Sequence, residues 1–351
     1  MATTNRAYWL DSLRLIAALA VVLQHYIERS FRAEAQWFLQ LGPGVFGVVL
    51  FFMISGYVIP FSVKSGFDFK EFVLRRIFRI WPMYLCVLAG IMVLGWANVA
   101  PFDAIQHLGW IDIVFNLLLI FEYSNAPAVL GVAWSLSLEL IWYGFFCLYV
   151  MRFRNRHAAQ IACVVSGLLV TAAGVAILLD TRLPFGRLGM LNAAMLGYAV
   201  FSYHQRHLSG RALACALLAF LLATWATQWV GFGYFTHENI SLHSGVISWT
   251  IASIVFAGIC LSPRIHLHNL WQEPWLIQLC AASYSIYLLH EPVSLLLVRW
   301  LNGGSLIIAA LACTCGLALL CYRLIEIPAI ALGRQLNFHK GSQNSRVQPI
   351  D

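Results

Sequence analysis

The chain has 351 residues, of which 61% are hydrophobic and only 11% are charged. A soluble globular domain carries about a quarter charged residues, so this composition excludes an ordinary water-soluble protein. The nine cysteines all lie in apolar stretches and form no CxxC pair, which argues against a disulfide framework or a zinc site. We therefore expect no metal.

Apolar segments close to the roughly 20 residues needed to cross a bilayer recur along the whole sequence. Ten can be marked, near residues 8–28, 43–63, 77–97, 132–151, 158–179, 188–203, 211–230, 243–262, 277–299 and 304–325. Between the third and the fourth, Trp110–Phe121 is apolar but too short to span, which suits a re-entrant or interfacial helix. The pattern predicts an all-α polytopic membrane protein with about ten transmembrane helices.

The lysines and arginines orient this bundle in the membrane. If the N-terminus is cytoplasmic, sixteen of the 22 basic residues fall on cytoplasmic segments, five fall outside and Arg14 is left within the membrane. The five outer residues are Arg29, Arg32, Arg182, Arg187 and Arg299. This distribution follows the positive-inside rule and places both termini in the cytoplasm. It also accounts for the net charge of +7, so we expect no nucleic-acid partner.

No change of composition marks a second domain. Residues 1–330 are expected to form one transmembrane domain, and residues 331–351 a polar C-terminal tail that is disordered from about residue 335. The chemistry is therefore expected within the membrane bundle.

Two ionisable residues in the first span are candidates for function, because charged groups inside a membrane are costly. Arg14 and His25 are eleven residues apart, and eleven steps of 100° fall within about 20° of three full turns. Both therefore project from one helix face, roughly 16 Å apart along the axis, with Arg14 toward the cytoplasm. Asp11 can pair with Arg14. The alternatives are that Arg14 snorkels toward the cytoplasm and that His25 is an incidental polar residue near the outer interface.

The third span opens with the sequence RRIFRI, which contains Arg75, Arg76 and Arg79. Arg76 and Arg79 are three residues apart and share a helix face. Guanidinium groups bind phosphate well, so the cluster suits a multiply phosphorylated cytoplasmic ligand such as coenzyme A. The same arginines can also serve only as a topology signal.

Two later spans contain further ionisable residues. In WSLSLELIWYGFF, Glu139 forms a polar stripe with Ser135 and Tyr143, which lie four residues before and after it. A carboxylate there should pair with an arginine or histidine from another span, either for catalysis or as a purely structural contact. In SYSIYLLHEPVSL, His290 lies on the outer half of its span. His25 and His290 are the candidates for proton transfer near neutral pH.

These motifs follow one another in a characteristic order. Asp11-x2-Arg14-x10-His25, FFMISGY, RRIFRI, WSLSLE, SYSIYLLHEP and IEIP cover residues 8–330, and together they resemble the membrane-bound acyltransferase-3 family. Members of that family have ten spans and include O-acetylases of O-antigen, exopolysaccharide and nodulation factors. The resemblance therefore implies a multi-pass enzyme of the cell (inner, cytoplasmic) membrane that moves an acyl group, usually acetyl from acetyl-CoA, to a sugar hydroxyl.

The resemblance also implies roles for residues of this sequence. The family's Arg-x10-His pair matches Arg14 and His25, and its Arg-x-x-Arg matches Arg76 and Arg79. Cytoplasmic acetyl-CoA, the acyl donor, is expected to bind to Arg75, Arg76 and Arg79. The expected catalytic residues are His25, as general base or transient acyl carrier, Arg14, as a donor or charge-stabilising contact, and Glu139 and His290, as orienting groups.

The acceptor is expected to be a carbohydrate or lipid-linked carbohydrate at the cell surface. A small-molecule acceptor such as a macrolide would use the same chemistry. A membrane transporter is the alternative from another class, because it also buries arginine, histidine and glutamate in its spans. Against a transporter, the sequence shows no inverted repeat.

Overall fold

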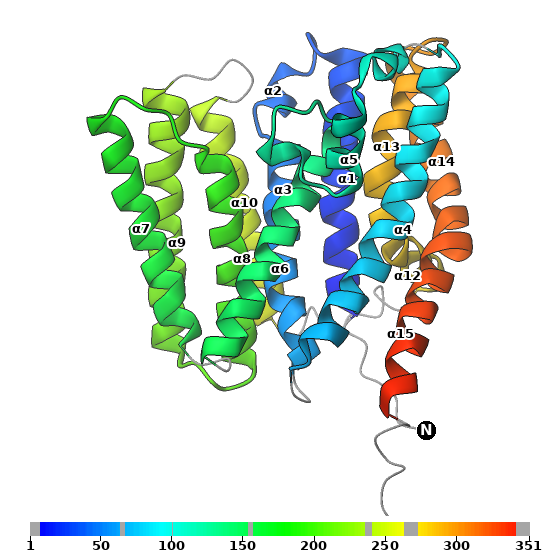
Figure 1. Cartoon of the computed structure of the whole chain (residues 1–351). Helices are drawn as coiled ribbons and strands as arrows, with labels where there is room; N and C mark the ends of the chain where they lie inside the picture. Colours follow the sequence, from blue (N-terminus) through cyan, green and yellow to red (C-terminus); the bar gives the residue numbers. More distant parts are fainter. Residues whose placement is uncertain are drawn as a thin grey trace, which may run out of the picture.

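The computed structural model describes residues 8–63, 67–99, 101–153, 157–235, 241–262 and 273–341. These residues form helices and turns and contain no strand (Figure 1). The principal helices are α1 (Tyr8–Phe31), α3 (Pro43–Val58), α4 (Phe69–Trp96), α6 (Trp134–Phe153), α7 (Ala158–Leu178), α8 (Phe185–His204), α9 (Gly210–Gln228), α10 (Leu242–Leu261), α13 (Ser283–Leu297), α14 (Gly303–Cys321) and α15 (Ile327–Gly341). The shorter helices are α2 (Gln36–Leu39), α5 (Trp110–Leu117) and α12 (Pro274–Ala281).

All ten predicted spans are largely helical. Within the described residues, eight helical stretches are long and apolar enough to cross a membrane. Two predicted spans are not among the eight. Residues 188–203 lie in α8, whose residues are mostly buried against other helices rather than turned to lipid. Residues 277–299 do not form one helix, because the helix is interrupted at Ala282, between α12 and α13.

Two smaller expectations have clear outcomes. Trp110–Phe121 contains the eight-residue helix α5 followed by a turn, and it is too short to span, as predicted. The disorder predicted from residue 335 is wrong as far as Gly341, because α15 continues to that residue. Helix α15 packs against α4, and this contact orders the start of the polar tail. Residues 342–351 lie outside the described part of the chain.

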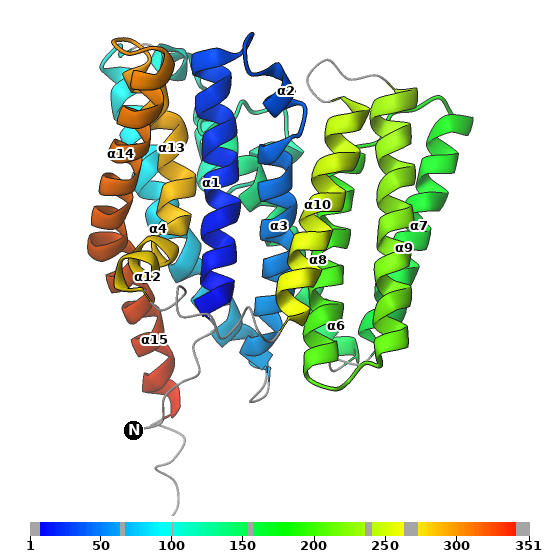
Figure 2. The ribbon, with the colours of Figure 1, turned by 180° about the vertical axis from the view of Figure 1, so that it is seen from behind.

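The helices form two groups joined by α3. Helices α7, α8, α9 and α10 make one group, while α1, α4, α13 and α14 lie on the other side (Figures 1 and 2). Helix α3 packs against α1, α8 and α10 and so connects the groups. Helix α1 begins and α15 ends on the same side of the bundle. Following the predicted orientation, we call this the inner side and the opposite one the outer side.

Two glycines allow α3 and α8 to pack backbone against backbone. A Cβ atom at Gly56 would collide with the carbonyl oxygen of Ala194, and one at Gly197 with the carbonyl oxygen of Met53. Small residues at such crossings let membrane helices gain van der Waals contact along their length. The joint between the two helix groups therefore depends on glycine at both positions.

Gly56→Ala is expected to destabilise the protein by about 3 kcal/mol, at the upper end of what overpacking costs, because the colliding atom is backbone. Thermal unfolding of the detergent-solubilised protein measures this loss. Gly144→Ala is the matched control, since no atom lies within 4 Å of a Cβ built there. Equal melting temperatures for the two variants would contradict the tight α3–α8 contact.

Candidate active site

A cavity of about 120 Å³ lies in the inner half of the bundle, among α1, α3, α4, α6 and α13. Its ionisable lining residues include Arg14, Arg76, Arg79 and Glu139, and the remainder is mostly aliphatic and aromatic. Two of the three guanidinium groups have a carboxylate partner, Asp11 for Arg14 and Glu326 for Arg79, so Arg76 is the lining arginine with no ion pair among the described residues. The sequence motifs from the first, third and fourth spans thus meet in one place.

The three arginines of the inner cavity have different surroundings. Arg14 donates to Asp11 at 3.3 Å, as the sequence predicted. Arg79 lies 3.3 Å from the Glu326 carboxylate. Arg76 lies over the rings of Phe72 and Tyr143, at 5.4 and 5.5 Å from their centroids. Within the described residues, the buried Nε of Arg76 has no hydrogen-bond partner. The buried Nε of Arg76 is therefore an unsatisfied donor beside this cavity.

Arg75 does not belong to this group. Its side chain is exposed, pairs with Glu71 one turn earlier and does not line the inner cavity. The cavity-facing residues of α4 are Arg76, Arg79 and Ile80, and Arg75 lies about 100° around the helix from Arg76. The structure therefore brings two of the three predicted donor-binding arginines together and turns the third away.

Glu139 is held by hydroxyl groups. Its Oε1 accepts hydrogen bonds from the Tyr143 hydroxyl at 2.6 Å and from Ser55 Oγ at 3.1 Å. Arg14 lines the same cavity and interacts with this carboxylate electrostatically. In the described residues, no ion pair joins Glu139 to the arginine or histidine that the sequence predicted as its partner. The residue of another span that contacts its carboxylate is Ser55.

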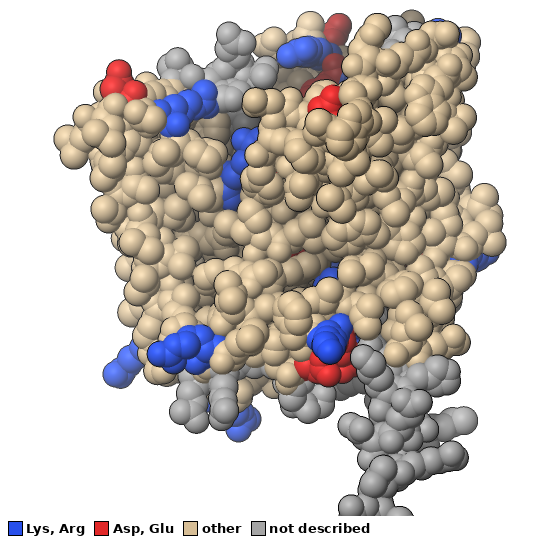
Figure 3. Space-filling view, in the orientation of Figure 1, with Lys and Arg blue, Asp and Glu red and all other residues tan. Residues whose placement is uncertain are grey.

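A larger cavity of about 720 Å³ opens on the outer side. Small-molecule sites typically measure 300–1,000 Å³, so this outer cavity has the size of a binding site. It is lined by His25 of α1, by the segment between α5 and α6, and by α8, α9 and α10. Its polar and aromatic lining includes Gln24, Glu122, Trp134, Arg182, Phe185, Arg187, Gln228, Phe232 and Trp249. Figure 3 shows the upper half of this face hollowed, with basic side chains there.

An ion pair braces this outer cavity. Glu122, just after α5, pairs with Arg187 of α8, and the Arg187 guanidinium lies 6.0 Å from the Trp134 ring. These residues were not predicted as site residues. Two features of the sequence could have drawn attention to this region: the short apolar stretch Trp110–Phe121, which ends just before Glu122, and the basic residues that fall on the outer side, which include Arg187.

His290 lies next to His25, which lines the outer cavity, while His290 itself is not among the lining residues. Their ring centroids are 5.2 Å apart and the rings are nearly perpendicular, at 88°. His290 is fully buried, and its Nδ1 lies 2.6 Å from the carbonyl oxygen of Tyr287. A carbonyl only accepts, so Nδ1 is assigned the proton and Nε2 is left as an acceptor. Within the described residues this Nε2 has no partner, a state that costs about 1–3 kcal/mol.

The two predicted histidines are thus brought together, and Arg14 and His25 line different cavities, one inner and one outer. In the described residues, no group of three or more His, Cys, Asp or Glu side chains lies close enough to hold a metal ion.

Comparison with known proteins assigns the fold to a family. Residues 7–325 match the family model described as an acyltransferase domain, the acyltransferase-3 type. The chain belongs to this acyltransferase family. The resemblance seen in the motif order is therefore confirmed, and it extends over nearly the whole transmembrane bundle.

Two of three curated relatives of this acyltransferase carry putative O-acetyltransferase names, and the third is named as a nodulation protein. It is 28% identical to the putative peptidoglycan O-acetyltransferase YrhL of Bacillus subtilis, over 91% of this chain and 54% of that protein. It is 26% identical to Nodulation protein 10 of Rhizobium leguminosarum bv. viciae, over 93% of this chain and 94% of that protein. It is 25% identical to a putative O-acetyltransferase of Staphylococcus aureus, over 91% of this chain and 56% of that protein. The chain therefore spans about half the length of the first and third relatives and nearly all of the second. No solved structure matches it.

Arg79 of the acyltransferase also stabilises the fold. Its partner Glu326 has a side chain only 1% exposed, and Ser285 donates a hydrogen bond to the same carboxylate. Removing one partner of a fully buried ion pair costs about 3–5 kcal/mol, because the other charge is left uncompensated, and less is expected here because the Arg79 side chain is 33% exposed. Arg79→Gln is therefore expected to lower the melting temperature, and adding Glu326→Gln should restore most of the loss. A double variant no more stable than Arg79→Gln alone would show that the pair does not couple.

Proposed function

We propose that this acyltransferase moves an acetyl group from cytoplasmic acetyl-CoA to a hydroxyl of a carbohydrate, or lipid-linked carbohydrate, on the outer side of the inner (cytoplasmic) membrane. One observation carries the proposal. An arginine-lined inner cavity and a larger outer cavity containing His25 lie on opposite sides of the bundle, and Val48 and Tyr287 line both. Donor and acceptor can therefore enter from opposite sides and meet inside the protein.

The donor enters the inner cavity with its acyl end first. A volume of 120 Å³ is well below the roughly 300–1,000 Å³ of small-molecule sites, so this cavity suits the thioester end but not the nucleotide of coenzyme A. The phosphates then remain at the inner end, where the guanidinium groups of Arg76 and Arg79 line the cavity and Arg79 is partly exposed. Arg14 and Glu139 lie deeper along the path of the arm.

The acceptor occupies the outer cavity. Flat indole surfaces from Trp134 and Trp249, together with the amides of Gln24 and Gln228, are a mixed lining that suits a sugar. The relatives named as O-acetyltransferases, one of them for peptidoglycan, support a carbohydrate hydroxyl as the group modified.

The chemistry is direct transfer with His25 as general base. His25 takes the proton of the acceptor hydroxyl as its oxygen attacks the thioester carbonyl carbon. The new C–O bond forms, the C–S bond breaks, and the departing thiolate takes the proton and leaves as coenzyme A thiol. The rings of His290 and His25 lie 5.2 Å apart, centroid to centroid, so a small rotation would let the unpaired Nε2 of His290 accept a hydrogen bond from an N–H of His25 and stabilise its imidazolium form.

Purified protein in lipid nanodiscs tests the reaction. With acetyl-CoA labelled in the acetyl group and surface glycans from cells lacking the chain, label is expected in the glycan. Label on a macrolide probe and not on the glycan would correct the acceptor. If proteoliposomes accumulate the compounds without covalent change, the protein is a transporter and the proposal fails.

A further inference from the structure

The inner and outer cavities are separated by a thin wall. Val48 of α3 and Tyr287 of α13 are the two described residues that line both cavities. Both are almost fully buried, with 6% and 5% of their surface exposed. These two side chains are therefore the described groups that a donor in one cavity and an acceptor in the other would both contact.

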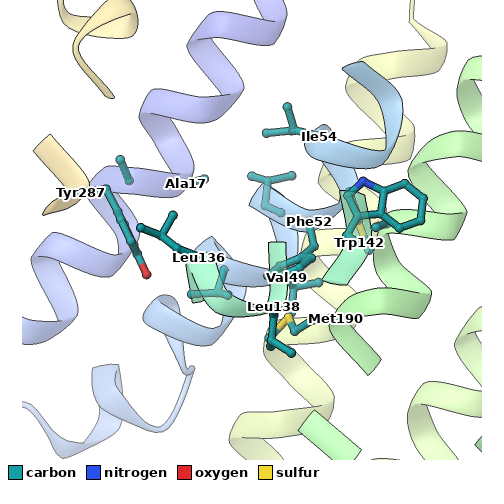
Figure 4. Packing of buried hydrophobic residues seen from close by; sticks show 14 of the residues in the cluster. Ala17, Val49, Phe52, Ile54, Leu136, Leu138, Trp142, Met190 and Tyr287 are labelled. Carbon is teal, nitrogen blue, oxygen red and sulfur yellow. The ribbon is translucent and has the colours of Figure 1, made fainter. Parts of the chain in front are cut away.

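The Tyr287 side of this wall is held in place. The Tyr287 hydroxyl lies 2.8 Å from Ser135 Oγ and donates to the carbonyl oxygen of Val132 at 3.0 Å. Its ring packs edge-on against Phe51, with centroids 5.5 Å apart. Figure 4 shows Leu136 lying beside the Tyr287 ring. A ring fixed by two hydrogen bonds and two apolar neighbours cannot swing aside at low cost.

The opposite side of the wall is Val48. A β-branched side chain in a helix is restricted to essentially one χ1 rotamer, so its two methyl groups occupy a constant position. Val48 and the hydrogen-bonded Tyr287 ring are therefore side chains of constant position that line both cavities.

We propose that the thioester carbonyl meets the acceptor hydroxyl at this wall, and that Val48 limits the transferred acyl group to the size of acetyl. The inference rests on the proposed function. During transfer the acyl carbon must lie within reach of a hydroxyl activated by His25 in the outer cavity, while the sulfur remains on the inner side. The acyl methyl group then lies against Val48, and each further methylene requires space that Val48 or Phe51 already fills.

Substitution of Val48 by a smaller residue tests this limit. The kcat/KM values of Val48→Ala for butanoyl-CoA and acetyl-CoA are compared, both with glycan from cells lacking the chain. The butanoyl-to-acetyl ratio is expected to rise at least about tenfold over wild type, because butanoyl has two more methylenes than acetyl and even one in an apolar pocket changes discrimination by about 10–200-fold. An unchanged ratio in a folded Val48→Ala variant overturns the proposal.

Val49→Ala is the matched control. Val49 is the next residue of α3, is fully buried, lines neither cavity, and lies near Leu138 and Met190 (Figure 4). Val49→Ala also removes two methyl groups from α3, but away from both cavities, so its butanoyl-to-acetyl ratio of kcat/KM should equal that of wild type. A rise as large as in Val48→Ala would show a general loosening of the bundle and overturn the assignment to Val48.

A narrowing variant covers the case in which Val48→Ala does not fold. Val48→Ile adds one methylene at the wall, so the acetyl transfer rate should fall about tenfold while the Kd of acetyl-CoA stays near wild type. An unchanged rate would overturn the proposal. If wild-type protein transfers no acyl group from either thioester, the proposed function fails. If it transfers acetyl but substitutions of Val48 do not change its preference for acyl chain length, only the proposed role of Val48 fails and the proposed function stands.

Discussion

His25→Ala is expected to lower kcat for acetyl transfer by about a thousandfold, within the 10²–10⁴ range that general acid–base groups supply. His25 lines the outer cavity and is the titratable residue next to the unpaired Nε2 of His290. Arg76 and Arg79 line only the inner cavity, so the Kd of acetyl-CoA should remain within about twofold of wild type. Single-turnover kinetics combined with equilibrium binding of acetyl-CoA measure the two quantities.

His207→Ala is the control for this prediction. His207 is exposed in the turn after α8, lines neither cavity, and should leave both values at wild type. A His25→Ala enzyme with wild-type kcat would remove the base from the mechanism. A large rise in the Kd of acetyl-CoA with an unchanged kcat would instead place His25 in the donor site.

Arg76→Gln is expected to weaken acetyl-CoA binding by ten- to a hundredfold, because a charge-assisted hydrogen bond contributes about 1.5–3 kcal/mol. Acetyl-pantetheine carries the same thioester arm without the nucleotide and its phosphates. Its affinity should therefore be nearly the same for wild type and Arg76→Gln. Isothermal titration calorimetry with both donors separates contact with the phosphates from a general disturbance of the cavity.

Arg75→Gln is the matched control for Arg76→Gln, since it removes the same charge from the neighbouring position. Arg75 pairs with Glu71 on the exposed side of α4 and should leave the affinity for acetyl-CoA unchanged. If the two variants lost affinity equally, the effect would come from net charge at the inner surface, and Arg76 would have no direct contact with the donor.

The positions of Arg14 and His25 show what helical periodicity can predict. Eleven steps along α1 place both side chains on one face, and the structure has Arg14 in the inner cavity and His25 in the outer one. The pairing of Arg14 with Asp11 is equally local and was predicted from spacing. Such inferences work because both residues belong to one helix, whose geometry is independent of the rest of the fold.

Contacts between helices were beyond this reasoning. Arg75 and Arg76 lie on either side of Arg79 around α4, so spacing alone could not decide which of the two faces the cavity. The partner of Glu139 is Ser55 of another helix, and the break at Ala282 falls within a continuous apolar run. Val48 reads as an ordinary apolar residue of a span. Its position at the wall depends on how α3 and α13 both pack against α1.

We propose that acetyl passes from a donor at the inner side to a glycan at the outer side with His25 as the base. Mass spectrometry of surface glycans tests this transfer in cells that lack the chain, express it, or express His25→Ala, all fed isotope-labelled acetate. Labelled O-acetyl groups are expected on a surface glycan only in cells with the unaltered chain. Equal O-acetylation in the His25→Ala cells, or no difference among the three strains, would rule out transfer through His25.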